Sequence, residues 1–289
     1  MSGGVAQDPE PERPRELPLP VRLFLIPALI VVAVGVVLLL YRLLGGAEST
    51  PRQMLDEVRS GSGHRRWQAA YELAHVLTRE DGIAQDPTLG PEMARLFEES
   101  AGRDPRVRRY LALGLGRARV AESLPSLQAA LADPDAETRV YAAWALGAIG
   151  DSTAAPALAA QAADPDPGMR KIVAYALGGL GSRSAIPTLK ALLADPTPDV
   201  RWNAALGLAR LGDQSGREVL GQMIDRDYLA GISGMTPEQH EAVIVNGVEG
   251  LALIGVGAYR PALDAIAERD PSPSVRAAAD RARRASGTH

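Results

Sequence analysis

The chain has 289 residues, a formal net charge of −4, an apolar content of 46% and no cysteine. This apolar content excludes disorder along the whole chain, and the lack of cysteine excludes disulfides, zinc–thiolate sites, iron–sulfur clusters and cysteine nucleophiles. The charge balance provides no basic stripe, so no nucleic acid partner is predicted. Aromatic residues make up only 4% of the chain, which favours thin, closely packed helices.

Residues 1–20 are rich in proline, glutamate and glycine and show almost no apolar periodicity. We expect a disordered tail there, with polyproline II character. The sequence supports no binding motif within it.

An apolar segment follows at residues 21–44. Residues 23–40 form a run of eighteen residues without a charged side chain. At about 1.5 Å per residue, a helix of this length spans roughly 27 Å, close to the hydrocarbon thickness of a bilayer. We therefore predict one transmembrane helix, which would contact the lipid bilayer through residues 21–44. A cleavable signal peptide is the alternative, because small residues follow at 45–47, although signal h-regions are shorter.

The orientation of this helix is weakly encoded. Three arginines precede the apolar run nearby and three follow it, so the positive-inside rule gives a tie. We expect the repeat domain on the extracytoplasmic side, because a large domain is exported after a signal anchor with little regard to its own charge.

Residues 45–63 are predicted to connect the membrane helix to the following domain. Thr50, Pro51 and Gln53 fit an N-cap, a first-turn proline and a glutamine that reaches back to the cap, so a short helix should begin at residue 51. The Gly/Ser run 60–63 should end that helix and let the next domain pivot.

A repeat with a period of 31 residues dominates the remainder, residues 64–289. Residues of one type recur at this spacing at several positions of the unit: Arg108, Arg139, Arg170 and Arg201; Leu115, Leu146, Leu177 and Leu208; Gly150, Gly181 and Gly212. In one unit, Asp133 and Pro134 are predicted to start a first helix, and Pro156 lies at the start of a second. Two short helices cannot bury their own faces, so neighbouring units must stack.

The segment 139–151, RVYAAWALGAIGD, with Pro156, Ala157 and Leu158 behind it, resembles the short HEAT repeats of the PBS-lyase type. The resemblance implies an all-α fold, an α-solenoid of about six stacked helical hairpins beside the one transmembrane helix. It also implies that the second helices of the hairpins line the concave face. Units are expected at 65–101, near 104, 133, 164 and 195, at 237–268, and as a half-unit at 275–279.

The repeated arginines, Arg108, Arg139, Arg170 and Arg201, could form an anion-binding row. We favour a structural ladder, in which they pair with acids such as Asp135, Asp166 and Asp199 or with backbone carbonyls between units. The aromatic residues at repeat positions, such as Tyr110, Tyr141 and Trp144, are expected in the core.

No catalytic or metal site is predicted. The four histidines contain no i, i+4 pair, and no cluster of titratable residues lies off the repeat lattice. His240-Glu241 is similar to the His–Glu pairs of deoxyhypusine hydroxylase, but that family needs several such pairs. No cofactor, no metal and no small-molecule substrate are therefore predicted, and we do not expect an enzyme.

The best candidate site is a break in the repeat. Gly212 and Gly255 are 43 residues apart where 31 are expected, an excess of 12. Insertions in repeat proteins fall in loops on one face and often bind partners. The extra chain carries the candidate protein-binding residues Tyr228, Leu229, Ile232 and Met235. The alternative is that these side chains pack beneath the neighbouring helices.

These features predict a membrane-anchored protein-interaction scaffold, or an accessory subunit of a membrane protein complex. Its partners are expected to be other, membrane-bound proteins, because a tether raises the effective concentration of the domain at the membrane surface. Bilin lyases and isomerases have similar repeats, so a lyase-like factor acting on a prosthetic-group-carrying client protein is the alternative. The membrane anchor argues against it.

Overall fold

The computed structural model describes residues 27–37, 39, 49–77 and 86–285, and within these residues the chain forms helices and turns but no strand. The chain divides into two units, Met1–Ser49 and Thr50–His289. The predicted tail 1–20 lies outside the described residues. So do most of the predicted membrane segment and the first residues of the predicted connector.

The described part of the first unit is a helix over residues 27–37. Its apolar side chains are exposed within this unit, with 63% of the surface of Leu29, 57% of Ile30 and 70% of Val31 open. Among the residues described, we find no helix with both the length and the apolar character that a membrane span requires.

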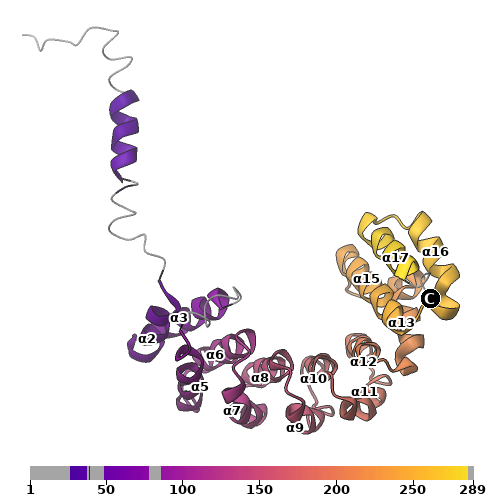
Figure 1. Ribbon diagram of the computed structural model, residues 1–289, viewed down its shortest axis with the longest axis horizontal. Helices are drawn as coiled ribbons and strands as arrows, with labels where there is room; N and C mark the ends of the chain where they lie inside the picture. The colour runs from indigo at the N-terminus through magenta and orange to yellow at the C-terminus, as the bar shows by residue number, and fades with distance from the viewer. Residues whose placement is uncertain (1–26, 38, 40–48, 78–85, 286–289) are drawn as a thin grey trace, which may run out of the picture. The chain divides into compact units, whose positions relative to one another are not determined.

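The second unit is a stack of helical hairpins (Figure 1). Its described first helices are α3 (Gly63–Val76), α6 (Pro105–Arg117), α8 (Ala136–Ile149), α10 (Pro167–Gly179), α12 (Pro198–Arg210) and α15 (Pro237–Ile254). The second helices are α5 (Leu89–Glu99), α7 (Leu124–Ala129), α9 (Ala155–Ala159), α11 (Ile186–Leu192), α13 (Arg217–Met223) and α16 (Arg260–Arg269). Helix α2 (Pro51–Ser60) precedes the stack, α14 (Arg226–Ala230) lies in the insertion, and α17 (Pro273–Ala285) closes the stack. The predicted all-helical repeat solenoid is confirmed.

The first helices begin at caps that the sequence supplies. Thr50 and Gln53 form the predicted capping box at the start of α2. The prediction for α8 was wrong by two residues, because Asp135 caps this helix. Asp133 instead accepts the backbone N–H of Asp135 at 2.9 Å and holds the preceding turn.

Helix α2 belongs to the stack, whereas the sequence prediction placed it in a flexible connector. Met54, Leu55 and Val58 are buried, and α2 packs against α3 and α5. The Arg66 guanidinium also donates to the carbonyl of Val58 at 2.9 Å. The physical reason is that the first hairpin has no preceding unit, and α2 covers the apolar face that would otherwise be open.

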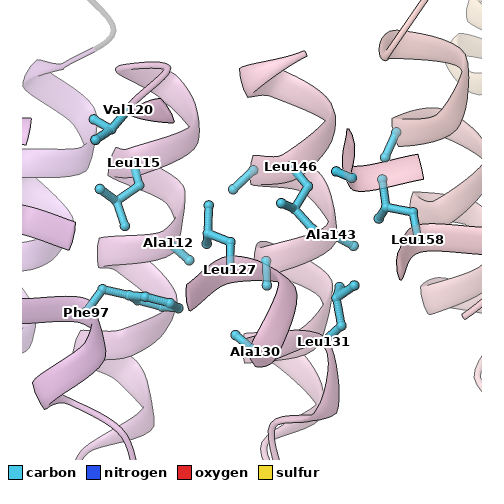
Figure 2. Close-up of a cluster of buried hydrophobic side chains, with 14 of the residues drawn as sticks. Phe97, Ala112, Leu115, Val120, Leu127, Ala130, Leu131, Ala143, Leu146 and Leu158 are labelled. Atoms are coloured by element: carbon cyan, nitrogen blue, oxygen red, sulfur yellow. The ribbon is translucent and has the colours of Figure 1, made fainter. Parts of the chain in front are cut away.

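The core runs continuously from unit to unit. Leu115 on α6, Leu127 on α7, Leu146 on α8 and Leu158 on α9 are all fully buried, and the leucines of one hairpin approach those of the next (Figure 2). Each such side chain contributes about 1.5–3 kcal/mol when it leaves water. One hairpin alone would expose these side chains, so the units depend on one another.

Glycines bring the backbones of successive first helices into contact. A Cβ added at Gly147 on α8 would lie 2.6 Å from the Cα of Ala176 on α10, and one at Gly178 on α10 would lie 2.5 Å from the Cα of Gly207 on α12. Both distances are shorter than carbon atoms tolerate. The spacing between first helices is therefore set by their main chains.

The first helices lie along the inner side of the curved stack. Figure 1 shows α6, α8, α10 and α12 on the inside of the arc and α7, α9 and α11 on the outside. The expectation that second helices line the concave face is thus wrong. Main-chain contact between the first helices keeps their side of the stack short, and the shorter side lies on the inside of the curve.

These contacts predict different outcomes for two adjacent glycines. Gly178→Ala should lower the free energy of unfolding by about 1–3 kcal/mol, because the new methyl group forces two helices apart. Gly179→Ala is the matched control: its Cβ would meet the carbonyl oxygen of Gly147 at 3.4 Å, an ordinary contact, and it should leave stability unchanged or raise it by up to about 1 kcal/mol. Urea denaturation measures both, and equal stabilities would contradict the close approach.

Candidate functional site

An aspartate in the turn before a first helix connects neighbouring units. The carboxylate of Asp195 accepts the backbone N–H of Thr197 at 2.8 Å and the guanidinium of Arg170 from the preceding unit at 2.7 Å. Its carbonyl accepts a hydrogen bond from Arg201, in its own unit, at 2.7 Å. One residue thus shapes the turn and joins two arginines that are 31 positions apart.

The predicted arginines occupy these turns, but their acidic partners differ from the prediction. Arg108 binds Asp133 at 2.7 Å, as Arg170 binds Asp195, and Arg139 donates to the carbonyl of Asp133 at 3.0 Å. The acids that were predicted have other contacts: Asp135 binds Arg109, Asp166 caps α10, and Asp199 lies 3.4 Å from Lys171. Helical arginines point back toward the helix N-terminus, which brings them to the turn aspartate rather than to the cap.

Acid should weaken this network. The hydrogen bond from Arg170 holds the pKa of Asp195 below its ordinary value of 3.8, and the hydroxyl and backbone N–H of Ser215 lower the pKa of Asp213 to about 2. A depressed carboxyl pKa contributes stability above the unfolded pKa, and that contribution is lost as the pH falls through the folded pKa.

We therefore expect the free energy of unfolding to fall as the pH is lowered from about 4 to about 2. Asp195→Asn should be less stable at neutral pH, because it leaves Arg170 without its carboxylate partner, and should lose less stability across this acid range. Asp199→Asn is the control, since its side chain is 51% exposed. Denaturation midpoints measured across the range test this, and identical acid slopes for the wild type and Asp195→Asn would contradict it.

Two of the four candidate residues of the insertion are built into the stack. Leu229 is fully buried, and the hydroxyl of Tyr228 accepts a hydrogen bond from Arg201 at 3.0 Å. One period after Asp195 the sequence has Arg226 instead of an aspartate, and Arg226 binds Asp270 at 2.7 Å. Tyr228 therefore takes the place of the aspartate as the partner of Arg201.

The other two, Ile232 and Met235, line a cavity of about 680 Å³. The remaining walls come from α8, α10, α12, α13 and α15, and most of these are first helices on the inner side of the arc. Aromatic side chains form one side, and polar residues stand among them. The lining residues used below are Trp144, Tyr175, Trp202, Ile232 and Met235.

The cavity suits an apolar group better than a reaction. Trp144, Tyr175 and Trp202 offer aromatic faces, and the insertion supplies two flexible aliphatic side chains opposite them. The charged residues of the lining, Lys171 and Asp199, lie 3.4 Å apart and balance each other. Within the described ranges, no group of histidine, aspartate and glutamate residues is arranged to hold a metal ion.

Aromatic side chains also continue along the inner face toward the N-terminal hairpin. The rings of Tyr71 and Tyr110 are 5.1 Å apart, and those of Tyr110 and Tyr141 are 6.4 Å apart. Tyr71 is 42% exposed and Tyr175 is 40% exposed. The expectation that the repeat aromatics are core residues is thus only partly right, because they rest on the core and remain accessible.

The sequence contained a signal for this aromatic row. Tyr141 and Trp144 are three residues apart and alternate with the fully buried Ala142, Ala143 and Leu146. The spacing therefore marks a second face of the helix beside the core stripe.

Comparison with known proteins agrees with this architecture. Residues 93–171 and 156–232 match the family model for HEAT repeats, so the chain contains HEAT repeats within an α-solenoid. No curated protein matches the chain in sequence.

Solved structures share the fold at low sequence identity. A structure of the complex of CpcE and CpcF of phycocyanin lyase, from a Nostoc species, is 24% identical, covers 82% of this chain and 88% of that chain, and has a TM-score of 0.58. An engineered protein is 18% identical, with 82% and 96% covered and a TM-score of 0.48. Human deoxyhypusine hydroxylase is 18% identical, with 83% and 85% covered and a TM-score of 0.37. Identities this low speak for the fold alone.

Proposed function

We propose that this chain is a scaffold that binds another protein through the inner face of its solenoid. The observation that carries the proposal is the cavity of about 680 Å³ between the aromatic first helices and the insertion. Of the twelve aromatic residues in the sequence, seven lie on the first helices α3, α6, α8, α10 and α12. Tryptophan and tyrosine are enriched at the centres of protein interfaces, where they anchor a partner.

The insertion supplies the adaptable part of this site. Ile232 and Met235 lie in the cavity wall, while Tyr228 and Leu229 fix the start of the insertion to the stack. A rigid aromatic wall opposite an adjustable aliphatic one can enclose an apolar side chain of a partner. The proposed role includes no catalytic step.

We propose further that residues 21–44 anchor the chain in a membrane, with the repeat domain on the extracytoplasmic side, and that the partner is a membrane protein. The support is the run of eighteen residues without a charge, together with the exposure of Leu29, Ile30 and Val31. A tether of this kind raises the effective concentration of the solenoid at the bilayer, so a weak contact can suffice.

A lyase-like factor acting on a prosthetic-group-carrying client is the second candidate. The cavity volume lies in the range that accommodates small organic groups, and the fold is similar to that of the CpcE and CpcF complex of phycocyanin lyase. A client that co-purifies with a coloured group would favour this candidate over a scaffold.

The scaffold proposal predicts which side chains a partner needs. After gentle solubilisation, the tagged full-length chain should retain a partner in stoichiometric amount, and Tyr175→Ala with Met235→Ala should reduce its recovery at least about tenfold, because two anchoring contacts are lost. Glu218→Ala, on the outer helix α13 and exposed, is the matched control. Recovery that is the same for both variants would contradict binding through the inner face.

The membrane proposal has an independent test. The full-length chain should remain in the membrane fraction after alkaline carbonate washing, because roughly eighteen apolar residues in a helix bind a bilayer firmly. A chain that begins at residue 49 should be released, and its helical circular dichroism should show that the solenoid is intact. Release of the full-length chain would overturn the anchor and leave the binding proposal untouched.

A further inference from the structure

A second cavity, of about 540 Å³, adjoins the aromatic one and is strongly basic. It lies at the C-terminal ends of α6, α8, α10 and α12, and its charged lining residues are Arg117, Arg119 and Arg210. Tyr175 lines both cavities, and the guanidinium of Arg210 lies 5.7 Å from the centre of its ring. The two cavities are therefore neighbours across one tyrosine.

The three positive charges have no acidic partner. The lining of this cavity contains no aspartate or glutamate. Among the described residues, none of the three arginines forms an ion pair with a carboxylate; Arg117 donates to the carbonyl of Ala74 at 2.8 Å and keeps its other donors. Like charges gathered in a hollow of low dielectric create a positive potential that attracts anions.

Arg119 adopts a backbone conformation that favours glycine. Its φ is 51°, and the residues one, two and three periods later are Gly150, Gly181 and Gly212, with φ values of 80°, 67° and 71°. A residue with a Cβ in this left-handed region costs roughly 1–2 kcal/mol. The fold would be more stable with glycine here, so the strain points to a use for the arginine side chain.

Helix capping does not account for this residue. Arginines near a helix C-terminus do stabilise the helix dipole, typically by about 0.3–1 kcal/mol. The equivalent ends of α8 and α10 have Gly150 and Gly181 instead. Those helices therefore end without an arginine at this position.

We propose that the partner bound by the inner face presents an acidic peptide segment with a bulky apolar side chain. The apolar side chain enters the cavity of Trp144, Tyr175 and Met235, and the carboxylates of the segment bind Arg119 and Arg210 across Tyr175. Arginine pairs with carboxylates through two parallel hydrogen bonds, which fixes their orientation as well as their charge. This inference rests on the proposed function and adds the chemistry of the partner.

The test is a display selection of random peptides on the purified chain that begins at residue 49, with its helical circular dichroism as the check of folding. We expect enriched peptides to share an Asp/Glu cluster and one large apolar residue at a fixed spacing. Their affinity should fall as salt is added, because surface charges are screened within about 8–10 Å near physiological ionic strength. Enrichment of neutral or basic peptides would overturn the inference.

Variants separate the two cavities. Arg119→Gly combined with Arg210→Gln should weaken a selected acidic peptide at least about tenfold, which is about 1.4 kcal/mol. The thermal midpoint of Arg119→Gly alone should not fall, because glycine relieves the left-handed strain. Arg183→Gln is the matched control, since Arg183 is exposed and lies in neither cavity.

The outcomes distinguish this inference from the function on which it rests. If Met235→Ala weakens the selected peptides and the arginine variants do not, the inner face binds a partner but the acidic segment is wrong. If neither change weakens them, both proposals fail. A loss caused equally by Arg183→Gln would mean non-specific charge attraction and would also overturn the inference.

Discussion

The structure depends on how closely successive first helices approach one another. At Gly147 and Gly178 the main chains are in contact, and no Cβ fits between them. This contact fixes the distance between units, keeps the first-helix side of the stack short and places that side on the inside of the arc (Figure 1). Larger residues cannot reach the seam, so Tyr141, Trp144 and Tyr175 rest beside it and stay accessible from the inner face.

The polar network follows the same repeat and tolerates one substitution. Asp133 and Asp195 each connect an arginine of the preceding unit to one of their own. Where the next aspartate is absent, the hydroxyl of Tyr228 binds Arg201. The ladder thus continues into the insertion, which explains how the stack accepts extra chain without losing contact between its units.

The insertion therefore has two roles in one short segment. Its first residues complete the stack, and Ile232 and Met235 form a wall of the aromatic cavity. Beside that cavity lie Arg119 and Arg210, which face no carboxylate. An apolar anchor next to a cationic hollow is a combination that neither the repeat alone nor the insertion alone would create.

The sequence by itself determined the repeat, because its period of 31 residues repeats the same leucines, arginines and glycines, and stacking follows from hairpins too thin to bury their own faces. It also located the insertion by a break in that period. Only the tertiary structure decided that α2 joins the stack and which aspartates bind the arginines. It also decided that the first helices line the inner face and that Tyr228 and Leu229 are structural while Ile232 and Met235 line a cavity. These outcomes depend on contacts between units, and residue spacing along the chain does not encode which neighbouring side chain a group will meet.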